Sequence, residues 1–472
     1  MTGRHHFLLL TYPIHSHTNP VLRLATRLIR LGVRVTVATS ASGCRRLIST
    51  TPPHEDLTFV EFPDNYAKGF SADGEEDDPV KLEIRWSCSE TLSRVISTSR
   101  ADGCPITCLV YTPTVPWVMG VAHELPVPSF LLWTQPATVL VIFYRFFFGY
   151  GDAIKAMFGK SSDCSAVSSI QLPGLPLTLK ASDFPTFMRP VNLHHPWGIN
   201  LFEEQSKWIA AQEKPSVLVN TFESLEPEAL KAVKELNLIP IGPLIPPQLV
   251  NGEDSSVADG PPAEEEDYVR WLNSKPNASV VYVSFGSIWN LASEQTEELA
   301  RALVQAGRPF LWVIKASAPQ EGNQEEEQKK DDAQISCMTE LEQLGLIVPW
   351  CNQVAVLSHP SVGCFVTHCG WNSTLESLAA GVPTVGIPIW VEQTTNAKLV
   401  EDYWKSGVRA RANENDLVET DEIRRCVDLV MADETFKRNA LKWRGLAFEA
   451  AKGDGPADDN LRQFVSELDA SL

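Results

Sequence analysis

The chain has 472 residues, enough for two or three domains that each bury a core. Asp and Glu number 59 and Lys and Arg 40, so the net charge of −19 argues against the broad cationic surface that nucleic acid or anionic lipid requires. The ten cysteines are scattered without a C-x-x-C pair, which favours reduced thiols and a cytoplasmic protein over a disulfide framework.

The apolar runs of the sequence are too short to cross a membrane. The most apolar one, Thr138 to Phe148, contains Arg145 and falls short of the roughly 20 residues that a spanning helix needs. The run from Phe7 to Leu10 is too short for a signal-peptide core, and no small-residue cleavage site follows it. We therefore expect no membrane insertion.

The first forty residues predict a strand, a helix and a second strand. These elements are expected over 6–12, 21–31 and 33–38. The residues from Pro13 to Pro20 are expected to form a loop, in which Asn19 and Pro20 suit the N-cap and the first helical position. Gly32 suits the position just past the helix. Such a unit pairs its strands in parallel and indicates an α/β fold.

A second unit of the same kind is expected further along the chain. Its strand, turn, helix and next strand are expected over 279–285, 286–287, 293–306 and 310–315. Between the two units, Gly242 to Glu266 is rich in Pro, Gly and acidic residues, a composition typical of a linker. The segment from Ala316 to Gln334 is highly charged and predicts a solvated loop. We infer two α/β domains with a cleft between them, and ligands at the carboxyl ends of the strands.

The most informative stretch runs from Trp350 to Gln393. A short apolar run ends in a glycine-containing turn, His368 to Ser373, and a helix is expected to follow. Ser373 and Glu376 fit a capping box at its start. A strand, a tight turn and a helix N-terminus together gather free N–H groups and the positive end of the helix dipole, so the sequence predicts a phosphate site here.

Other nucleotide-binding motifs are missing from the sequence. There is no G-x-G-x-x-G after the first strand and no G-x-x-x-x-G-K-[ST], so dinucleotide binding and P-loop hydrolysis lose their main support. There is also no Asp-x-Asp pair to hold a divalent metal on a diphosphate, and we expect no metal cofactor.

The stretch 350–393 resembles the 44-residue donor-binding signature of the plant UDP-dependent glycosyltransferases, and the likeness extends over nearly the whole chain. The residues that carry it are Trp350, Gln353, the run from His368 to Ser373, Glu376, Glu392 and Gln393. Within the family, the chain looks most similar to the group that contains anthocyanin 5-O-glucosyltransferases. Tyr111-Thr112 and the segments 132–137 and 347–351 suggest this group.

The resemblance implies a two-domain fold of the GT-B type, with two Rossmann-like doubly wound domains facing each other across a cleft. We expect an acceptor domain over 1–243, a linker over 244–266 and a UDP-sugar domain over 267–454. Helices are expected over 443–451 and 460–468. By the same resemblance, the last helix, within about 455–472, returns to the first domain. The expected protein is a monomer.

The resemblance also implies the roles of the donor-binding residues. Trp350 would stack on the uracil, with Cys351 beside it and Gln353 holding the nucleoside, because an indole offers a large flat apolar face. Glu376 would accept hydrogen bonds from the ribose, although a capping role alone is the simpler alternative. The diphosphate would be held around the helix start, by His368, Trp371, Asn372 and Ser373. Ser287 would reach the same phosphates or be an ordinary turn residue.

The sugar end of the donor is implied to contact Trp390, Glu392 and Gln393, and Thr134 is a further candidate. The family usually has Asp at the position of Glu392, and one extra methylene moves the carboxylate by roughly a bond length. Gln393 resembles the glucose-using members. The resemblance therefore favours UDP-glucose as the donor substrate.

His17 matches the N-terminal histidine of the family and is our candidate catalytic base. Its pKa class suits proton abstraction near neutral pH. Many members pair this histidine with an aspartate that follows a tyrosine, whereas here Thr112 follows Tyr111. A hydroxyl could orient the ring but could not offset the charge of an imidazolium. His17 would then act with weaker support, or the acceptor would be an acidic group such as a phenol or a carboxylic acid.

The acceptor pocket is expected in the first domain, where aromatic residues are frequent. Candidates are His15, Trp133, Gln135, Phe143, Phe184 and Phe187, although most aromatic residues in such a segment belong to a core.

The expected function is therefore inverting glucosyl transfer from UDP-glucose to a small plant phenolic of the flavonoid type, giving a β-glucoside. Variants within this class form C-glucosides, or glucose esters of an apocarotenoid or hormone acid. A catalytically silent UDP-sugar sensor is the alternative from another class.

Overall fold

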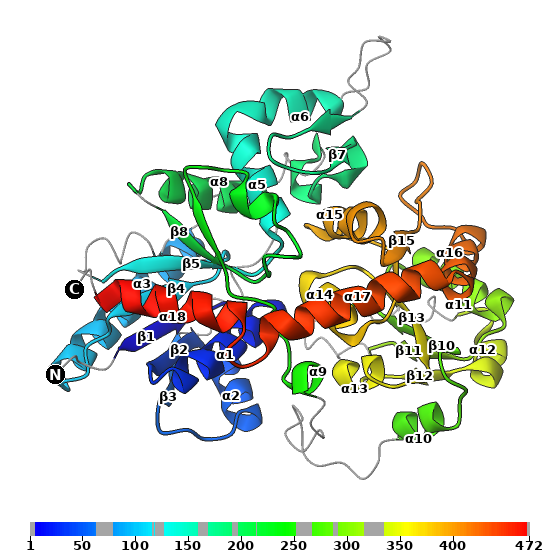
Figure 1. Ribbon diagram of the computed structural model, residues 1–472, viewed down its shortest axis with the longest axis horizontal. Coiled ribbons are helices and arrows are strands. Elements are labelled where there is room, and N and C mark those ends of the chain that lie inside the picture. Colours follow the sequence, from blue (N-terminus) through cyan, green and yellow to red (C-terminus); the bar gives the residue numbers. More distant parts are fainter. Residues whose placement is uncertain are drawn as a thin grey trace. The chain divides into compact units, whose positions relative to one another are not determined.

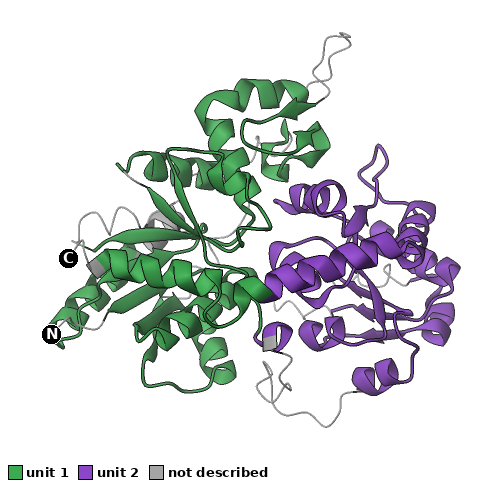
Figure 2. Cartoon of the chain, viewed as in Figure 1, with its two compact units in different colours: residues 1–246, 449–472 green, residues 247–448 purple. Residues whose placement is uncertain are grey.

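The protein is described by a computed structural model covering residues 5–62, 79–115, 118, 127–158, 169–190, 197–213, 215–251, 267–286, 291–315 and 335–469. The chain divides into two compact units (Figure 2). Unit 1 comprises residues 1–246 and 449–472, and unit 2 comprises residues 247–448. Figure 1 labels the elements of both units.

Within the described residues, unit 1 contains a seven-stranded parallel sheet. Its order is β3-β2-β1-β4-β5-β8-β9. The strands are β1 His6–Leu10, β2 Arg34–Ser40, β3 Leu57–Phe62, β4 Cys108–Tyr111, β5 Ser129–Trp133, β8 Ser216–Val219 and β9 Asn237–Pro240. A small antiparallel pair joins β6 Ile170–Gln171 and β7 Thr178–Leu179. The near-continuous apolar composition of β1 fits a strand that is covered on both faces.

The sheet of unit 1 is accompanied by helices and short helical turns. The helices are α1 His15–Arg30, α2 Ala41–Thr50, α3 Pro79–Ala101, α5 Ala137–Arg145, α6 Gly151–Met157, α8 Trp197–Ala210 and α18 Pro456–Asp469. The shorter turns are η2 Phe146–Tyr150, η3 Ala181–Asp183, η4 Thr186–Met188 and η5 Ala229–Lys231.

The C-terminal helix α18 packs into the core of unit 1. Leu461 and Phe464 belong to the same buried cluster as Phe7 and the other apolar residues of β1. The ring of Phe464 meets those of Phe7 and Phe130 edge-on, at centroid distances of 6.2 and 4.8 Å. A segment far from the N-terminus in sequence therefore completes this core, as the colours of Figure 1 show.

The start of α1 differs from the sequence expectation. The helix begins at His15 with Ile14 as its N-cap, so Asn19 and Pro20 lie inside the helix and the expected loop from Pro13 to Pro20 is wrong. The Ile14 carbonyl accepts hydrogen bonds from the N–H groups of His17 and Thr18, at 3.0 and 2.9 Å. This closes the first turn before Pro20, which lies in the second turn and has no N–H to donate to the carbonyl of Ser16. His17 is therefore the third residue of a helix.

Unit 2 contains a six-stranded parallel sheet in the described part of the chain, with the order β12-β11-β10-β13-β14-β15. The strands are β10 Val280–Ser284, β11 Phe310–Val313, β12 Leu346–Val348, β13 Val362–Thr367, β14 Thr384–Gly386 and β15 Gly407–Arg409. The helices are α9 Gln248–Asn251, α10 Asp267–Asn273, α11 Ser293–Ala306, α12 Met338–Leu344, α13 Gln353–Leu357, α14 Trp371–Ala380, α15 Gln393–Lys398, α16 Thr420–Ala432 and α17 Glu434–Ala451, with the turn η7 Leu399–Tyr403.

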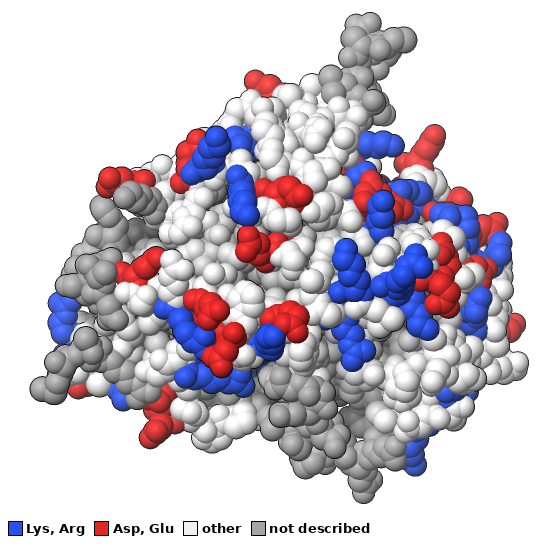
Figure 3. All heavy atoms as spheres, viewed as in Figure 1, with Lys and Arg blue, Asp and Glu red and all other residues white. Residues whose placement is uncertain are grey.

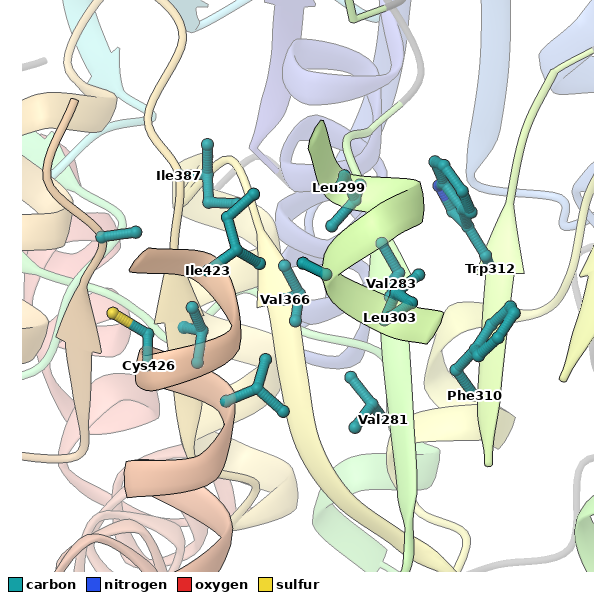
Figure 4. Close-up of a cluster of buried hydrophobic side chains, with 14 of the residues drawn as sticks. Val281, Val283, Leu299, Leu303, Phe310, Trp312, Val366, Ile387, Ile423 and Cys426 are labelled. Carbon is teal, nitrogen blue, oxygen red and sulfur yellow. The ribbon is translucent and has the colours of Figure 1, made fainter. Parts of the chain in front are cut away.

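One face of the unit 2 sheet packs against α11 and α16 (Figure 4). Val281, Val283 and Val366 come from the central strands, while Leu299 and Ile423 come from the two helices. Burial of such aliphatic side chains contributes about 1.5–3 kcal/mol each. This packing fixes the position of β10 and β13, whose carboxyl ends carry the candidate site.

Both sheets have Rossmann-type topology. Numbered along each unit, the strands follow the order 3-2-1-4-5-6, with one further strand in unit 1. The order reverses between β1 and β4 in unit 1 and between β10 and β13 in unit 2. The α/β fold class is thus confirmed. Ligands of such sheets bind beyond the carboxyl ends of the strands at this reversal.

One helical stretch, Ala137–Met157, has the length and mean hydropathy (1.3) of a membrane span, although half of it is buried inside the protein. Its backbone is also broken by non-helical angles at Phe148 and Gly149. Burial and this break favour a core element of unit 1.

Three parts of the chain discussed above lie outside the described residues. They are the charged segment 316–334, most of the expected linker (252–266) and Ser287. On the face drawn in Figure 3, acidic and basic side chains are interspersed.

Candidate active site

The anion site expected in unit 2 is built around the first turn of α14. The helix begins at Trp371 with Gly370 as N-cap and without a side-chain cap, so the expected capping box of Ser373 and Glu376 is wrong. The preceding turn is tight, because Cys369 has a φ of 61° and a Cβ on Gly370 would lie 2.5 Å from the His368 ring. The first N–H groups of the helix have no carbonyl partner within it, which makes them donors for an anion.

His368 occupies the point where the sheet order reverses. Its ring lies against Gly286, at the end of β10, where a Cβ would come within 2.8 Å of two ring atoms. Gly286 also has a φ of 79°, which disfavours other residues. Burial, together with the nearby charge of Lys315, lowers the pKa of His368 to about 4. At neutral pH the ring is uncharged, and an adjacent diphosphate would favour its protonated form.

Trp350 follows β12 and is unusual among the aromatic residues, because 57% of its surface is exposed. An exposed indole beside an anion site is suited to stack on a planar base. Cys351, next in the chain, is buried and its Sγ lies 3.4 Å from the hydroxyl of Tyr282. The Trp350 ring is therefore exposed to solvent, whereas the Cys351 side chain packs inside unit 2.

Gln353 connects three neighbouring elements through its amide. Its Nε2 donates to Glu376 Oε2 at 2.7 Å and to Ser373 Oγ at 3.1 Å, both on α14. Its Oε1 accepts a hydrogen bond from the Tyr282 hydroxyl at 3.2 Å. Glu376 is thus held through Gln353, with part of its surface accessible. Sequence reasoning missed Tyr282, which looks like an ordinary residue of a buried strand.

The side chain of Trp371 points into the protein. It is 3% exposed and its ring lies 5.9 Å from that of Trp404. The ring therefore packs inside the protein, and the backbone N–H of Trp371 hydrogen-bonds to the Glu392 carboxylate. Asn372 is partly exposed beside it.

Glu392 is a buried carboxylate next to the start of α14. Burial raises its pKa to about 7, and opposing hydrogen bonds come from the backbone N–H groups of Glu392 and Trp371 and from the Asn396 side chain. Its carboxylate therefore lies beside the N–H of Trp371 that opens α14. Asn396 is itself held by the Cys369 carbonyl, to which it donates at 2.8 Å. Sequence reasoning missed Asn396 and Lys315, because neither belongs to the contiguous signature.

Gln393 organises the loop that carries the remaining sugar candidates. Its Oε1 accepts hydrogen bonds from the N–H groups of Ile389 and Trp390, both at 2.9 Å. Val391 has a φ of 55°, an uncommon conformation for a β-branched residue. The strained loop holds Trp390 and Glu392 in place, and such strain is frequent at ligand sites.

The candidate base belongs to unit 1, at the end of β1. His17 is buried, and burial lowers its pKa to about 4. It therefore stays neutral at pH 7 and has a lone pair available to accept a proton. His15, the first residue of α1, is exposed and lies at the outer edge of this turn. The structure thus distinguishes the two histidines that the sequence places two residues apart.

Thr112 and Thr134 mark the ends of β4 and β5, the next strands of the sheet. The hydroxyls of Thr112 and Thr114 lie 3.3 Å apart. By contrast, Thr134 Oγ1 lies 3.5 Å from Nδ1 of His17. The structure therefore brings Thr134, expected at the sugar, next to His17.

Three of the aromatic candidates for the acceptor pocket, Trp133, Phe143 and Phe187, are buried in a common cluster. Its centre is Phe202 of α8, which the sequence reasoning missed. Phe143 stacks on Phe202 at 4.1 Å, and Trp133 and Phe187 approach it at 5.8 and 5.9 Å. Phe184 is also buried and contacts Phe158. Burial of these rings favours a core role.

Gln135 differs from these rings because it is polar. It is buried, and its Oε1 has no hydrogen-bond partner in the described part of the chain. Buried polar atoms are normally paired, so this oxygen is a candidate contact for a ligand.

The described residues contain no group of three or more His, Cys, Asp and Glu side chains that could hold a metal ion.

The fold and this geometry define an α/β protein with a candidate anion site at a Rossmann switch point. The family model for UDP-glucoronosyl and UDP-glucosyl transferases matches residues 201–448. A crocetin glucosyltransferase of Gardenia jasminoides is 48% identical over 99% of this chain and 98% of its own. An anthocyanidin 3-O-glucoside 5-O-glucosyltransferase of Verbena hybrida is 42% identical over 99% of each chain.

A solved structure gives the same result for the fold. Os79 from O. sativa, in complex with UDP, has a TM-score of 0.76 and 28% identity, covering 98% of this chain and all of its own. The chain therefore belongs to the UDP-dependent glycosyltransferase family, an enzyme family with the GT-B fold.

Proposed function

We propose that the protein transfers glucose from UDP-glucose, with inversion, to a hydroxyl or carboxyl group of a small plant metabolite and forms a β-glucoside. The observation that carries this proposal is the group at the start of α14. There the exposed Trp350 lies three residues before Gln353, whose amide donates hydrogen bonds to Ser373 and Glu376. This group combines a base-stacking face, a carboxylate for ribose hydroxyls and a helix N-terminus for phosphate.

Each part of UDP-glucose would contact a different part of this group. The uracil would stack on Trp350, and Glu376 would accept hydrogen bonds from the ribose hydroxyls. His368 and the N–H groups of Asn372 and Ser373 would hold the diphosphate. Glucose would contact the loop that Gln393 organises, including Trp390 and Glu392.

His17 would accept the proton of the acceptor group. The acceptor oxygen would attack C1 of glucose from the face opposite UDP, and the bond from C1 to UDP would break with its electron pair remaining on UDP. Backbone N–H groups and the dipole of α14 would stabilise the diphosphate that leaves. We propose that these groups act without a metal ion.

The acceptor proposal rests on the environment of His17. In the described part of the chain, the hydroxyl of Thr134 lies beside the His17 ring. A hydroxyl cannot offset the charge of an imidazolium, so an acceptor that ionises readily is favoured. Phenols and carboxylic acids meet this condition. Crocetin, a polyene dicarboxylic acid, and anthocyanidin glucosides, which are phenols, are the substrates that the two relatives are named for. A flavonoid-type phenol remains our first candidate.

We further propose a cytoplasmic monomer. Eight cysteines in the described part of the chain are free, as expected in a reducing compartment. The Gardenia relative is named as chloroplastic, so fractionation of plant cells that express a tagged protein would test the compartment.

The test is incubation of the purified protein with UDP-glucose and a panel of flavonoids, anthocyanins, phenolic acids and apocarotenoid acids, followed by mass spectrometry. We expect a mass gain of one hexose on at least one acceptor, and NMR of the product should show a β-anomeric linkage. The variant His17→Gln should bind UDP with unchanged affinity and lose most of the turnover. Tight UDP-glucose binding without transfer to any acceptor would instead indicate a sensor, and a hydrolysis-resistant product would indicate C-glucosylation.

A further inference from the structure

The His17 ring has a polar neighbour other than the residue at the expected aspartate position. Its Nδ1 lies 3.5 Å from the Thr134 hydroxyl, and the two side chains are only 9% and 4% exposed. Catalytic hydrogen bonds are often this long in structures without substrate. Thr112, which occupies the aspartate position, is fully buried and adjoins Thr114 instead.

The loop that carries Thr134 is held by hydrogen bonds of neighbouring residues. It follows Trp133, the last residue of β5, whose indole N–H donates to the carbonyl of Pro136 at 2.8 Å and closes a short loop. Helix α5 begins at the next residue, Ala137, so the loop is fixed between a central strand and a helix N-terminus. The main chain around Thr134 therefore has little freedom.

The N-terminus of α5 is anchored by Glu226, a carboxylate that is 2% exposed. Its two oxygens accept hydrogen bonds from the N–H groups of Ala137 and Thr138, each at 2.9 Å. The Thr138 hydroxyl adds a third at 2.7 Å. Burial of a carboxylate is costly unless it is paired and hydrogen-bonded, and the positive end of a helix dipole offsets part of that cost. Glu226 lies 89 positions from Ala137, so this anchor is a tertiary feature.

We propose that Thr134 is the positioning residue for His17, in the place of the missing aspartate, and that Glu226 holds the loop that presents it. The Thr134 hydroxyl accepts the Nδ1 hydrogen of the neutral ring, which leaves the lone pair on Nε2. During transfer, the acceptor proton moves to Nε2 as its oxygen attacks C1 of glucose. This inference rests on the proposed role of His17 as the base.

The first test is Thr134→Val, which removes the hydroxyl and keeps the shape. We expect kcat/KM for the acceptor to fall roughly 3- to 10-fold, the effect of one neutral hydrogen bond. The dissociation constant of UDP-glucose should remain within twofold. Transfer to a weakly acidic acceptor should suffer more than transfer to a strongly acidic one, because the former depends more on the base.

The decisive readout is the tautomer of His17, measured by ¹⁵N–¹H correlation spectra of the imidazole without any substrate. The signal is assigned by its loss in His17→Gln. The wild-type ring should carry its hydrogen on Nδ1, and Thr134→Val should shift the population toward Nε2–H. An unchanged tautomer would overturn the proposal. If the UDP-glucose affinity is also weakened, Thr134 is a sugar contact; if the affinity is unchanged, Thr134 is a packing residue.

Thr112→Val is the matched control, because it makes the same change at the aspartate position. It should leave the His17 tautomer unchanged. A shift caused by Thr112→Val but not by Thr134→Val would assign the positioning role to Thr112 and overturn the proposal.

Glu226 is tested by Glu226→Gln, which can no longer accept both backbone N–H groups. A mixed tautomer of His17 is expected. If this variant does not fold, Thr138→Val removes one of the three hydrogen bonds and should give a smaller shift of the same sign. A folded variant with a wild-type His17 spectrum would refute the anchoring role.

These spectra separate the inference from the proposed function. A wild-type protein that transfers no glucose to any acceptor would refute the proposed function, whereas the tautomer measurement would still decide whether Thr134 orients His17.

Discussion

The pKa of His17 leads to a quantitative prediction for the pH dependence of transfer. Burial lowers this pKa from 6.5 to about 4, so the ring stays neutral far into the acidic range. At pH 5.5, about 97% of the rings should be neutral, compared with about 9% for a histidine with an ordinary pKa. The shift of 2.5 units corresponds to about 3 kcal/mol against protonation of the folded protein.

The assay is kcat/KM for the acceptor between pH 4 and 9, at saturating UDP-glucose and constant ionic strength. Saturation with the donor removes the titration of groups that act only in donor binding, such as Glu392. The acidic limb should have its midpoint near pH 4 and should be absent from the residual activity of His17→Gln. A midpoint near 6.5 in a protein that remains folded, by circular dichroism, would refute the assignment of a buried base.

The same shift predicts a direction for stability. Because the folded protein binds the proton on His17 less tightly than the unfolded chain does, the contribution of His17 is fully present above pH 6.5. It is lost as the pH falls from 6.5 to about 4. Wild-type protein should therefore lose more stability over this range than His17→Gln, as measured by urea unfolding of the two proteins at each pH.

Three further predictions concern the donor site and metals. Trp350→Ala should raise the Kd of UDP by roughly 5- to 150-fold, because stacking of a base on an aromatic ring contributes about 1–3 kcal/mol; calorimetry that finds a Kd within twofold of wild type would rule out stacking. Burial raises the pKa of Glu392 to about 7, so the affinity for UDP-glucose relative to UDP should increase from pH 6 to pH 8 as the carboxylate ionises, and Glu392→Gln should abolish this increase. Dialysis against EDTA should leave the transfer rate unchanged, whereas a large loss that Mg²⁺ restores would contradict metal-free transfer.

Local patterns predicted much of the fold correctly. The helix expected over 293–306 has the same bounds as α11, and Gly307 ends it in the left-handed conformation, with a φ of 61°. The two strand–helix–strand units also form as expected. These elements were predictable because apolar periodicity and glycine preferences act within a few residues.

Both errors at helix starts have the same physical cause. Asn19 and Ser373 have side chains that favour capping, yet α1 begins at His15 and α14 at Trp371. In each case the turn from a strand into a helix is shorter than expected, and its geometry is set by the packing of the helix on the sheet. Preferences for capping are worth about 1 kcal/mol, and tertiary packing overrides them.

The amino-acid sequence by itself determined the elements, the contiguous donor signature from Trp350 to Gln393 and the candidate base, because these depend on residue type and short spacing. Tertiary structure decided which side chains act together. It joined Tyr282 to Gln353 across 71 positions and brought Thr134 to His17 across 117. Strand order in the sheet brings such residues together, and this order depends on contacts between distant parts of the chain. For the same reason, a threonine other than the one in the motif became the neighbour of His17.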